Sequence, residues 1–325
     1  MNKSEKLSLV FENAERVSFD DRSRLVFFSD VHRGDNSWAD EFAPNAVTYS
    51  HALEYYYRAG FTYVEVGDGD ELLKNTGWQS IRTAHAGVYE KLREFYTRGR
   101  LYYLHGNHDI PYSGKQTAEQ SLGTLYDPFR AQSEPLFPGI KVHEGLVLVH
   151  EETGGELFVT HGHQGEILND RFWKVSRFLL RFLWRPLQLL GIQNPSRVSS
   201  NPEIRKDIER QLCDWIRDNE QPLLCGHTHL AHFSRAGEAP YFNTGSCVHP
   251  RWITGIEIDQ GEIMLVRWRV KPGERGGLYI HREVLAGPER VADYYQKEPL
   301  PQDNLDLSLA PRTSPRSGIL EEARM

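Results

Sequence analysis

Aspartate, asparagine and histidine residues recur in five short motifs between residues 30 and 229 of this 325-residue chain. Each motif follows an apolar run of strand-like length, such as 24–30 or 61–68. The motifs are D-V-H, G-D-G-D-E, G-N-H-D, H-G-H and G-H-T-H, and they supply Asp30, His32, Asp68, Asn107, His108, His161, His163, His227 and His229 as possible metal ligands or catalytic groups. Because ligands of open α/β sheets bind outside the carboxyl ends of the strands, we expect these loops to meet at one place.

The ligand types indicate which metals such a site would hold. Carboxylate, amide oxygen and imidazole without thiolate suit hard or borderline divalent cations, so we expect Mn²⁺ first, with Fe²⁺, Zn²⁺ or Ni²⁺ as alternatives. The three cysteines, Cys213, Cys225 and Cys247, form no C-x-x-C pair, which argues against a zinc knuckle and favours a reduced compartment. Two cations about 3.5–4 Å apart, held by a bridging carboxylate, can clamp the attacking and leaving oxygens of a phosphate ester.

Each motif alone is a weak signal. A single D-x-H or H-x-H is common on protein surfaces, and G-N-H-D can be a plain turn because Asn and Gly favour left-handed backbone. The ordered set, with every member after a strand-like run, is the informative observation. It predicts a two-metal phosphoesterase.

The first half of the chain predicts the elements that would position these residues. Strand-like runs at 24–30, 61–68 and 100–109 alternate with helical patterns over 44–60 and 78–98. Such β-α-β passages predict a mostly parallel sheet with helices on its faces.

The second half has a different pattern. Residues 141–163 predict two strands around a Gly-Gly turn, and helical stretches follow at about 168–190 and 202–219. The segments 241–246, 252–259 and 262–270 predict a β-meander. We therefore expect a second sheet, with more antiparallel character, packed on the first.

Composition sets the domain organisation and excludes some functions. With 39% apolar and 26% charged residues, the chain is ordinary for a globular protein. We expect one domain over 1–286 and a charged, proline-containing, partly disordered tail over 287–325. The first residues contain no apolar run long enough for a signal peptide, so we expect a cytoplasmic protein. A net charge of −7 argues against nucleic acid as a partner.

The order of the motifs resembles the calcineurin-like metallophosphoesterase superfamily over residues 30–229, and Asn243 begins an N-T-G-S turn similar to one that follows in the family. The resemblance implies an α/β fold: a four-layer α/β/β/α sandwich of two mixed β-sheets with flanking helices, here with a helical insertion at about 168–219. It implies that one metal is held by Asp30, His32, Asp68 and His229, and that Asp68 bridges to a second metal held by Asn107, His161 and His227.

The resemblance also implies catalytic roles. His108 matches the catalytic histidine of the family, which protonates the leaving group or stabilises the phosphoryl oxygens, while a metal-bridging hydroxide attacks phosphorus. Asp109 is expected to orient that imidazole. His163 is expected beside the ligands or facing the substrate, because the implied ligand set is complete without it. Arg33 is expected either to contact a substrate phosphate or to be an ordinary exposed arginine.

The segment 171–191 is the strongest clue to the substrate. Helical periodicity places five cations on one arc of roughly 120°, and these are Arg171, Lys174, Arg177, Arg181 and Arg185. The rest of the circumference is apolar, and 171–185 contains no acid. One interpretation is a lid or peripheral contact at the inner membrane surface, with Arg177 and Arg181 binding the phosphate of a lipid-linked substrate. The other is a helix packed on the core, with its arginines reaching outward to water.

A helical insertion after H-G-H is similar to the arrangement in UDP-2,3-diacylglucosamine pyrophosphatases, but those enzymes typically carry arginine at the position of His108. We therefore expect hydrolysis of a phosphomonoester or phosphodiester, on a lipid-linked or nucleotide-type small molecule, with the pyrophosphatase as the alternative. Among other enzymes of the superfamily, protein phosphatases carry a G-D-x-V-D-R-G motif, whose arginine is missing here. A non-catalytic scaffold of the same fold is the alternative from another class, although all seven candidate ligands and His108 are present.

Overall fold

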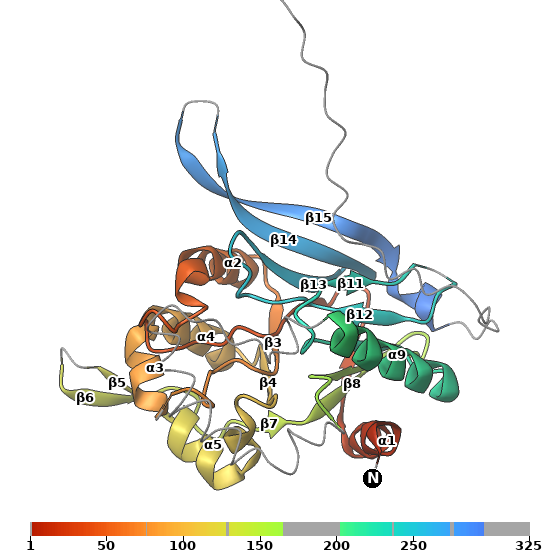
Figure 1. The fold of residues 1–325 in the computed structure, drawn as a ribbon, viewed down its shortest axis with the longest axis horizontal. Helices are drawn as coiled ribbons and strands as arrows, with labels where there is room; N and C mark the ends of the chain where they lie inside the picture. Colours follow the sequence, from red (N-terminus) through yellow and green to blue (C-terminus); the bar gives the residue numbers. More distant parts are fainter. Residues whose placement is uncertain are drawn as a thin grey trace, which may run out of the picture.

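Two β-sheets pack face to face in the computed structural model, and helices cover both outer faces (Figure 1). The structure describes residues 2–75, 77–127, 130–164, 202–235, 237–273 and 276–295. The seven-stranded sheet contains, in spatial order, β15 (Leu278–Arg290), β14 (Glu262–Pro272), β13 (Ile253–Asp259), β2 (Arg24–Phe28), β3 (Thr62–Val66), β4 (Leu101–Leu104) and β7 (Val142–His143). The six-stranded sheet contains β1 (Glu15–Phe19), β8 (Gly145–His150), β9 (Glu156–Thr160), β10 (Leu223–Cys225), β12 (Tyr241–Asn243) and β11 (His232–Phe233).

Alternating side chains on the central strands build the core between these layers. On β2, Val26 and Phe28 pack under the outer helices, whereas Leu25 and Phe27 face the other sheet. The helices on this side are α2 (Ala46–Arg58), α3 (Trp78–Ala84), α4 (Ala86–Thr97) and α5 (Lys115–Leu122), with short 3₁₀ turns η1 (Ala43–Asn45) and η2 (Ile110–Ser113). A small hairpin of β5 (Thr124–Asp127) and β6 (Gln132–Pro135) lies beside them (Figure 1).

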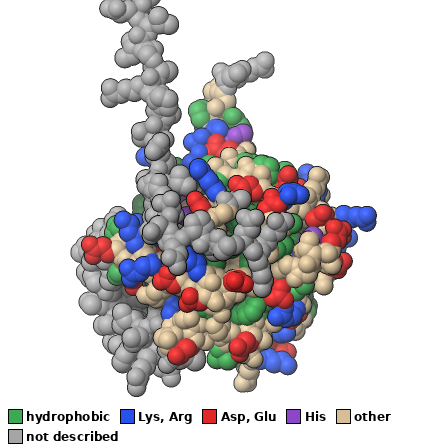
Figure 2. Space-filling view, turned by 90° about the vertical axis from the view of Figure 1, so that its right-hand side faces the viewer, with side chains coloured by type: hydrophobic (Ala, Val, Ile, Leu, Met, Phe, Trp, Pro, Cys, Tyr) green, Lys and Arg blue, Asp and Glu red, His purple; other side chains and the backbone are tan. Residues whose placement is uncertain are grey.

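Two helices, α1 (Lys3–Asn13) and α9 (Pro202–Asn219), cover the other sheet. Leu7 of α1 and Trp215 of α9 are buried against Phe158 of β9. The four-layer sandwich with two mixed sheets is therefore confirmed. On the face drawn in Figure 2, acidic and basic side chains are interspersed rather than gathered by sign.

Some of the sequence-based expectations need correction. Of the expected β-meander, β13 and β14 do form an antiparallel pair, but its first strand is wrong, because β12 pairs in parallel with β10 in the other sheet. The expected helix over 78–98 is two helices that meet at His85. The domain boundary predicted at 286–287 falls inside β15, which continues to Arg290 and leads into the 3₁₀ turn η5 (Val291–Tyr294).

The expected amphipathic helix at 171–191, with Arg177 and Arg181, lies outside the described residues. Of the expected insertion at 168–219, the structure describes α9. Within the described part of the chain, no helix has the length and apolar character needed to cross a membrane.

Candidate metal centre

The candidate ligands lie in loops at the carboxyl ends of β2, β3, β4, β9 and β10, as the strand pattern predicts. Five of them have a left-handed backbone, with φ of 50–70°: Asp30, His32, Asp68, His227 and His229. This conformation costs free energy for residues other than glycine, and such residues cluster at functional sites, where the surrounding structure holds them in place.

Backbone hydrogen bonds hold the first two ligand loops together. Asp30 N donates to Gly67 O at 3.1 Å, and His32 N donates to Asp68 O at 2.9 Å. The loop after β10 joins them because His227 N donates to Asp30 Oδ2 at 2.8 Å. The positions of the ligands are therefore fixed by the polypeptide itself.

One group of donor atoms comprises Asp30, His32 and His229. His229 Nε2 lies 3.1 Å from Asp30 Oδ1 and 3.2 Å from His32 Nε2. His32 Nε2 lies 3.7 Å from Asp30 Oδ1. Two imidazole nitrogens this close to each other and to a carboxylate need a proton or a metal cation to offset their lone pairs.

A second group comprises Asp68, His161 and His227. Asp68 Oδ2 lies 3.2 Å from His161 Nε2 and 3.8 Å from His32 Nε2, so this carboxylate lies between the two groups. His161 Nδ1 is 2.9 Å from Val66 O, a contact that makes Nδ1 the donor and leaves Nε2 to face Asp68. The Oδ1 atom of Asn107 is buried and has no hydrogen-bond partner among the described residues.

The electrostatics of the two groups suit cation binding. Burial lowers the pKa of His32, but the carboxylates of Asp30 and Glu71 outweigh it and raise the pKa to about 10. Burial also lowers the pKa of His161, and Asp68 outweighs it to raise the pKa to about 9. Burial opposes the ionisation of Asp30, yet His229 and the other histidines hold its pKa well below the usual range. Without metals, protons on these imidazoles therefore balance the negative charge of the neighbouring carboxylates. Bound metal cations would balance that charge in their place.

The comparisons with known proteins agree with this geometry. The family model described as calcineurin-like phosphoesterase matches residues 23–231, a range that contains both donor groups. The chain belongs to the calcineurin-like phosphoesterase family. Divalent metals are typical of this family, and the two donor groups could hold them.

Two solved structures resemble this calcineurin-like phosphoesterase at low identity. Vps29 of Chaetomium thermophilum is 9% identical, with a TM-score of 0.36, and the alignment covers 82% of this chain and 96% of Vps29. The sulfate thiohydrolase SoxB of Termus thermophilus is 13% identical, with a TM-score of 0.31, and the alignment covers 85% of this chain and 59% of SoxB. The comparison with curated proteins found no match.

His108 lies beside both donor groups. Its Nε2 is 4.0 Å from Asp68 Oδ2, and its ring centre is 4.5 Å from that of His32. Its Nδ1 lies 2.8 Å from Glu71 Oε1. Burial opposes the ionisation of Glu71, but His108 and Lys74 hold its pKa well below the usual range. Because Glu71 is thus an acceptor, Nδ1 of His108 donates and Nε2 is left to face the metal centre.

The expected partner of His108 therefore needs correction, because the orienting carboxylate is Glu71 rather than Asp109. Asp109 is buried and accepts hydrogen bonds from the backbone N–H groups of Gly106 at 2.6 Å and Gly69 at 2.8 Å. It thereby joins the loop after β3 to the loop after β4. The G-D-G-D-E motif contained the signal for Glu71, an acid three residues after Asp68.

The expected role of Arg33 also needs correction. Arg33 is fully buried, and its guanidinium lies on the outer-helix side of the seven-stranded sheet instead of in solvent. Its Nε donates to Asp70 Oδ1 at 2.7 Å, and its Nη2 donates to Glu65 Oε2 at 2.9 Å. The ring of Tyr89 covers it at 5.2 Å. Arg33 therefore neutralises two interior carboxylates and is not placed to contact substrate.

His163 lies beside the ligands, with its ring centre 5.4 Å from that of His161 and 6.4 Å from that of His227. Burial and the neighbouring His161 hold its pKa well below the usual range, so the imidazole is neutral. The ring centre of His105, a residue outside the five motifs, lies 6.0 Å from that of His163. Contact of His163 with substrate stays a prediction.

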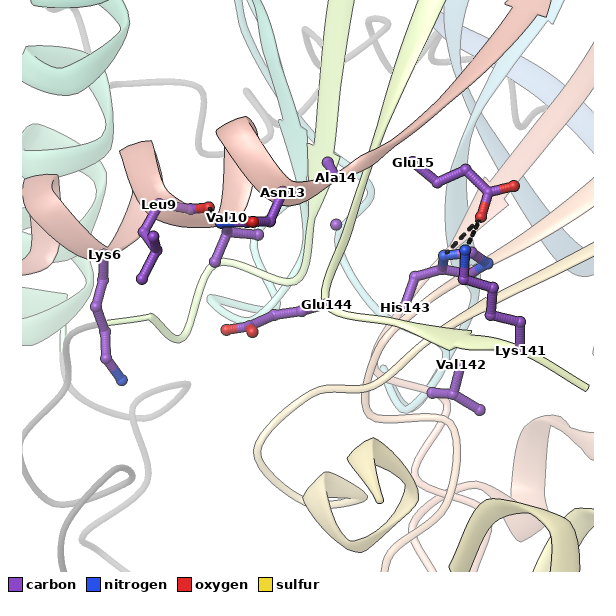
Figure 3. A pocket seen from close by; sticks show the side chains of 11 residues that line it. Lys6, Leu9, Val10, Asn13, Ala14, Glu15, Lys141, Val142, His143 and Glu144 are labelled. Carbon is purple, nitrogen blue, oxygen red and sulfur yellow. Dashed lines mark hydrogen bonds and ion pairs between the residues drawn. The ribbon is translucent and has the colours of Figure 1, made fainter. Parts of the chain in front are cut away.

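A cavity of about 760 Å³ opens away from these groups, between α1, β1 and the β7–β8 connection (Figure 3). Glu15, Lys141 and His143 face one another on one side of it, with Lys141 and His143 both paired to Glu15. None of the predicted metal ligands lines this cavity. The cavity is therefore separate from the candidate metal ligands of the motif loops.

Gly106 allows the close approach of the loops that carry Asp68 and Asn107. A Cβ atom on Gly106 would lie 2.1 Å from Asp68 Oδ1 and 2.7 Å from Asp68 N. We expect Gly106→Ala to displace the Asp68 carboxylate and to weaken Mn²⁺ binding by about 10- to 100-fold, measured by calorimetric titration. Gly87→Ala is the matched control, because a Cβ there meets no described atom within 4 Å. Equal Mn²⁺ affinity in both variants would contradict this account.

Proposed function

We propose that this calcineurin-like phosphoesterase hydrolyses a phosphomonoester or phosphodiester with the help of two divalent metal ions. The position of Asp68 carries the proposal, because this carboxylate lies between His32 of one donor group and His161 of the other. A buried carboxylate between two imidazole clusters is the arrangement that a dinuclear site requires. The substrate class that fits the sequence is a lipid-linked or nucleotide-type small molecule.

The residues present fit two metal ions. Asn107 offers a buried amide oxygen with no hydrogen-bond partner in the described part of the chain, an energetically costly state that a metal would relieve. Asp68 would serve both ions, with Asp30, His32 and His229 completing one site and Asn107, His161 and His227 the other. Bound there, the ions would activate water as a nucleophile and offset charge on the phosphoryl oxygens.

His108 is the residue placed to move a proton. Glu71 accepts from Nδ1 and so fixes the ring orientation, while Nε2 points toward the donor groups. At 20% side-chain exposure, His108 is open to an incoming substrate, whereas His32 is only 5% exposed. A protonated Nε2 can give its proton to the leaving oxygen of the ester.

Proton donation by His108 predicts how the kcat values of two variants depend on the leaving group of the ester. Poor leaving groups need a proton and good ones do not, so we expect His108→Gln to reduce kcat for phenyl phosphate by about 100-fold or more. The loss for p-nitrophenyl phosphate should be much smaller, and Glu71→Gln should give intermediate losses for both esters. Steady-state kinetics with both esters measures this. A loss of equal size for the two esters would exclude proton donation by His108.

The experiment that tests the function itself is an assay of the metal-free and the Mn²⁺-loaded protein with p-nitrophenyl phosphate and bis-p-nitrophenyl phosphate. We expect hydrolysis only after Mn²⁺ is added, and the preferred ester distinguishes a monoesterase from a diesterase. A protein that binds two metals but hydrolyses neither ester would favour a pyrophosphatase acting on lipid-linked diphosphates. A protein that binds no metal would overturn the proposal in favour of a non-catalytic scaffold.

A further inference from the structure

The ribbon formed by β14 and β15 projects beyond the layers of the sandwich (Figure 1). β15 is the last strand of the seven-stranded sheet, and no described strand pairs with its outer edge. Several apolar side chains of the ribbon are exposed: Leu278 at 76%, Tyr279 at 48%, Val270 at 48% and Val284 at 41%. Figure 2 shows hydrophobic side chains on this projecting part of the molecule.

Only one end of this edge is protected against pairing. Between Val284 and Ala286 the register with β14 shifts and leaves Leu285 unpaired, and the sequence then continues with Gly287 and Pro288. Bulges and proline are devices that block an edge strand. The preceding window 278–284, LYIHREV, has no proline, glycine or lysine and is rich in residues that favour strands. An open edge of this kind is a template for another strand.

The register of the hairpin shows which residues of the window direct their backbone hydrogen-bonding groups away from β14. Gly273 N donates to Gly277 O at 2.7 Å, and Pro272 lies opposite Leu278. Because hydrogen-bonded and non-hydrogen-bonded pairs alternate in an antiparallel ladder, the even-numbered residues from 278 to 284 direct their backbone N–H and C=O groups to the outer edge. The window 278–284 can therefore accept a strand along its length.

We propose that β15 pairs antiparallel with β15 of a second copy of this chain, about a twofold axis at His281. In that register Leu278 lies opposite the partner's Val284, and Tyr279 lies opposite the partner's Glu283. At each end of the window, Leu278 of one copy and Val284 of the other thus bring two exposed apolar side chains together. A twofold axis normal to the sheet also places the same face of each sheet on the same side of the dimer. The two seven-stranded sheets become one continuous sheet across the dimer.

The charges of the window are compatible with this pairing. Glu283 is bound by Lys271 at 3.1 Å and also by Arg267, both on the adjacent β14. Arg282 is bound to Glu257 of β13, with Nε 2.8 Å from Oε1. Each copy therefore compensates these charges internally, so bringing two copies together leaves no unpaired carboxylate at the new edge. Tyr279 can offer its hydroxyl to the partner's Glu283.

The first test measures the mass of the full chain by light scattering during size-exclusion chromatography over a range of concentrations. We expect twice the chain mass of 37.5 kDa at high concentration. Val284→Lys should shift the protein to the monomer mass, because it places a charge opposite the partner's Leu278. Val47→Lys, at a 74% exposed site on α2, is the control and should remain dimeric. A monomer at all concentrations, or a dimer that survives Val284→Lys, would overturn the proposal.

A cysteine at the axis tests the register. His281→Cys should form an intermolecular disulfide under mild oxidation, because residues directly opposite in a non-hydrogen-bonded pair are close enough for this bond. The native Cys213, Cys225 and Cys247 are buried, and Val47→Cys serves as the exposed control. No crosslink with His281→Cys, or equal crosslinking with Val47→Cys, would reject the proposed axis. Neither test depends on phosphoesterase activity.

Discussion

Replacing Asp68 by alanine is expected to reduce Mn²⁺-dependent hydrolysis of the preferred p-nitrophenyl ester by at least about 1,000-fold. Asp68 Oδ2 lies 3.2 Å from His161 Nε2 and 3.8 Å from His32 Nε2, so the substitution removes a carboxylate that lies between the two donor groups. Metal ions contribute several kcal/mol of transition-state stabilisation, and each 1.36 kcal/mol is a factor of about ten in rate. Asp68→Asn keeps the size of the side chain but removes its charge, and is expected to lose nearly as much.

Metal stoichiometry separates this effect from misfolding. Calorimetric titration should show fewer than two Mn²⁺ ions bound per chain in Asp68→Ala, while its circular dichroism spectrum stays that of the wild type. Asp218→Ala, at an exposed position on α9, is the matched control and should keep full activity and stoichiometry. Retention of two tight Mn²⁺ sites, or of more than a tenth of the activity, in Asp68→Ala would show that Asp68 does not bridge the metals.

Replacing Arg33 by methionine is expected to lower the free energy of unfolding by about 3–5 kcal/mol. Arg33, Glu65 and Asp70 form a fully buried group, and methionine would leave both carboxylates in the interior without the cation that pairs with them. Urea unfolding measures the change. Arg16→Met removes the arginine of a surface pair with Glu156 and is the control, for which we expect at most about 1 kcal/mol.

The loss of unfolding free energy in Arg33→Met should increase as the pH rises. Burial raises the pKa of Glu65 in the wild type, whereas for Asp70 the charge of Arg33 and other partners outweigh burial and lower the pKa; removing the cation raises the folded-state pKa values of both acids. An acid whose folded-state pKa is raised loses stability as pH rises through that value, so the deficit should be largest near pH 8 and smaller near pH 5.5. A deficit below about 1 kcal/mol at pH 8, or one that grows on acidification, would contradict a buried charge cluster.

The sequence by itself determined the ligand loops and the sandwich class. Residue type and strand-like apolar runs are local properties, and the carboxyl ends of parallel strands must meet at one edge of a sheet. Asp30, Asp68 and Asn107 could therefore be assigned to one site, and the structure brings together the loops that carry them. The strand pattern of the second half added the expectation of a second sheet, and the resemblance implied the four-layer arrangement.

Only the tertiary structure decided the partners of these residues. The motif G-N-H-D placed Asp109 next to His108, yet Glu71 from another loop meets the imidazole, because the direction of a side chain depends on the packed backbone and not on nearness in sequence. Arg33 is polar and follows a ligand loop, but the carboxylates that bury it, Glu65 and Asp70, come from β3 and the loop after it. The placement of β12 and β13 in different sheets also could not be predicted from the sequence. Strand pairing is decided by long-range contacts, and a local sequence pattern does not contain them.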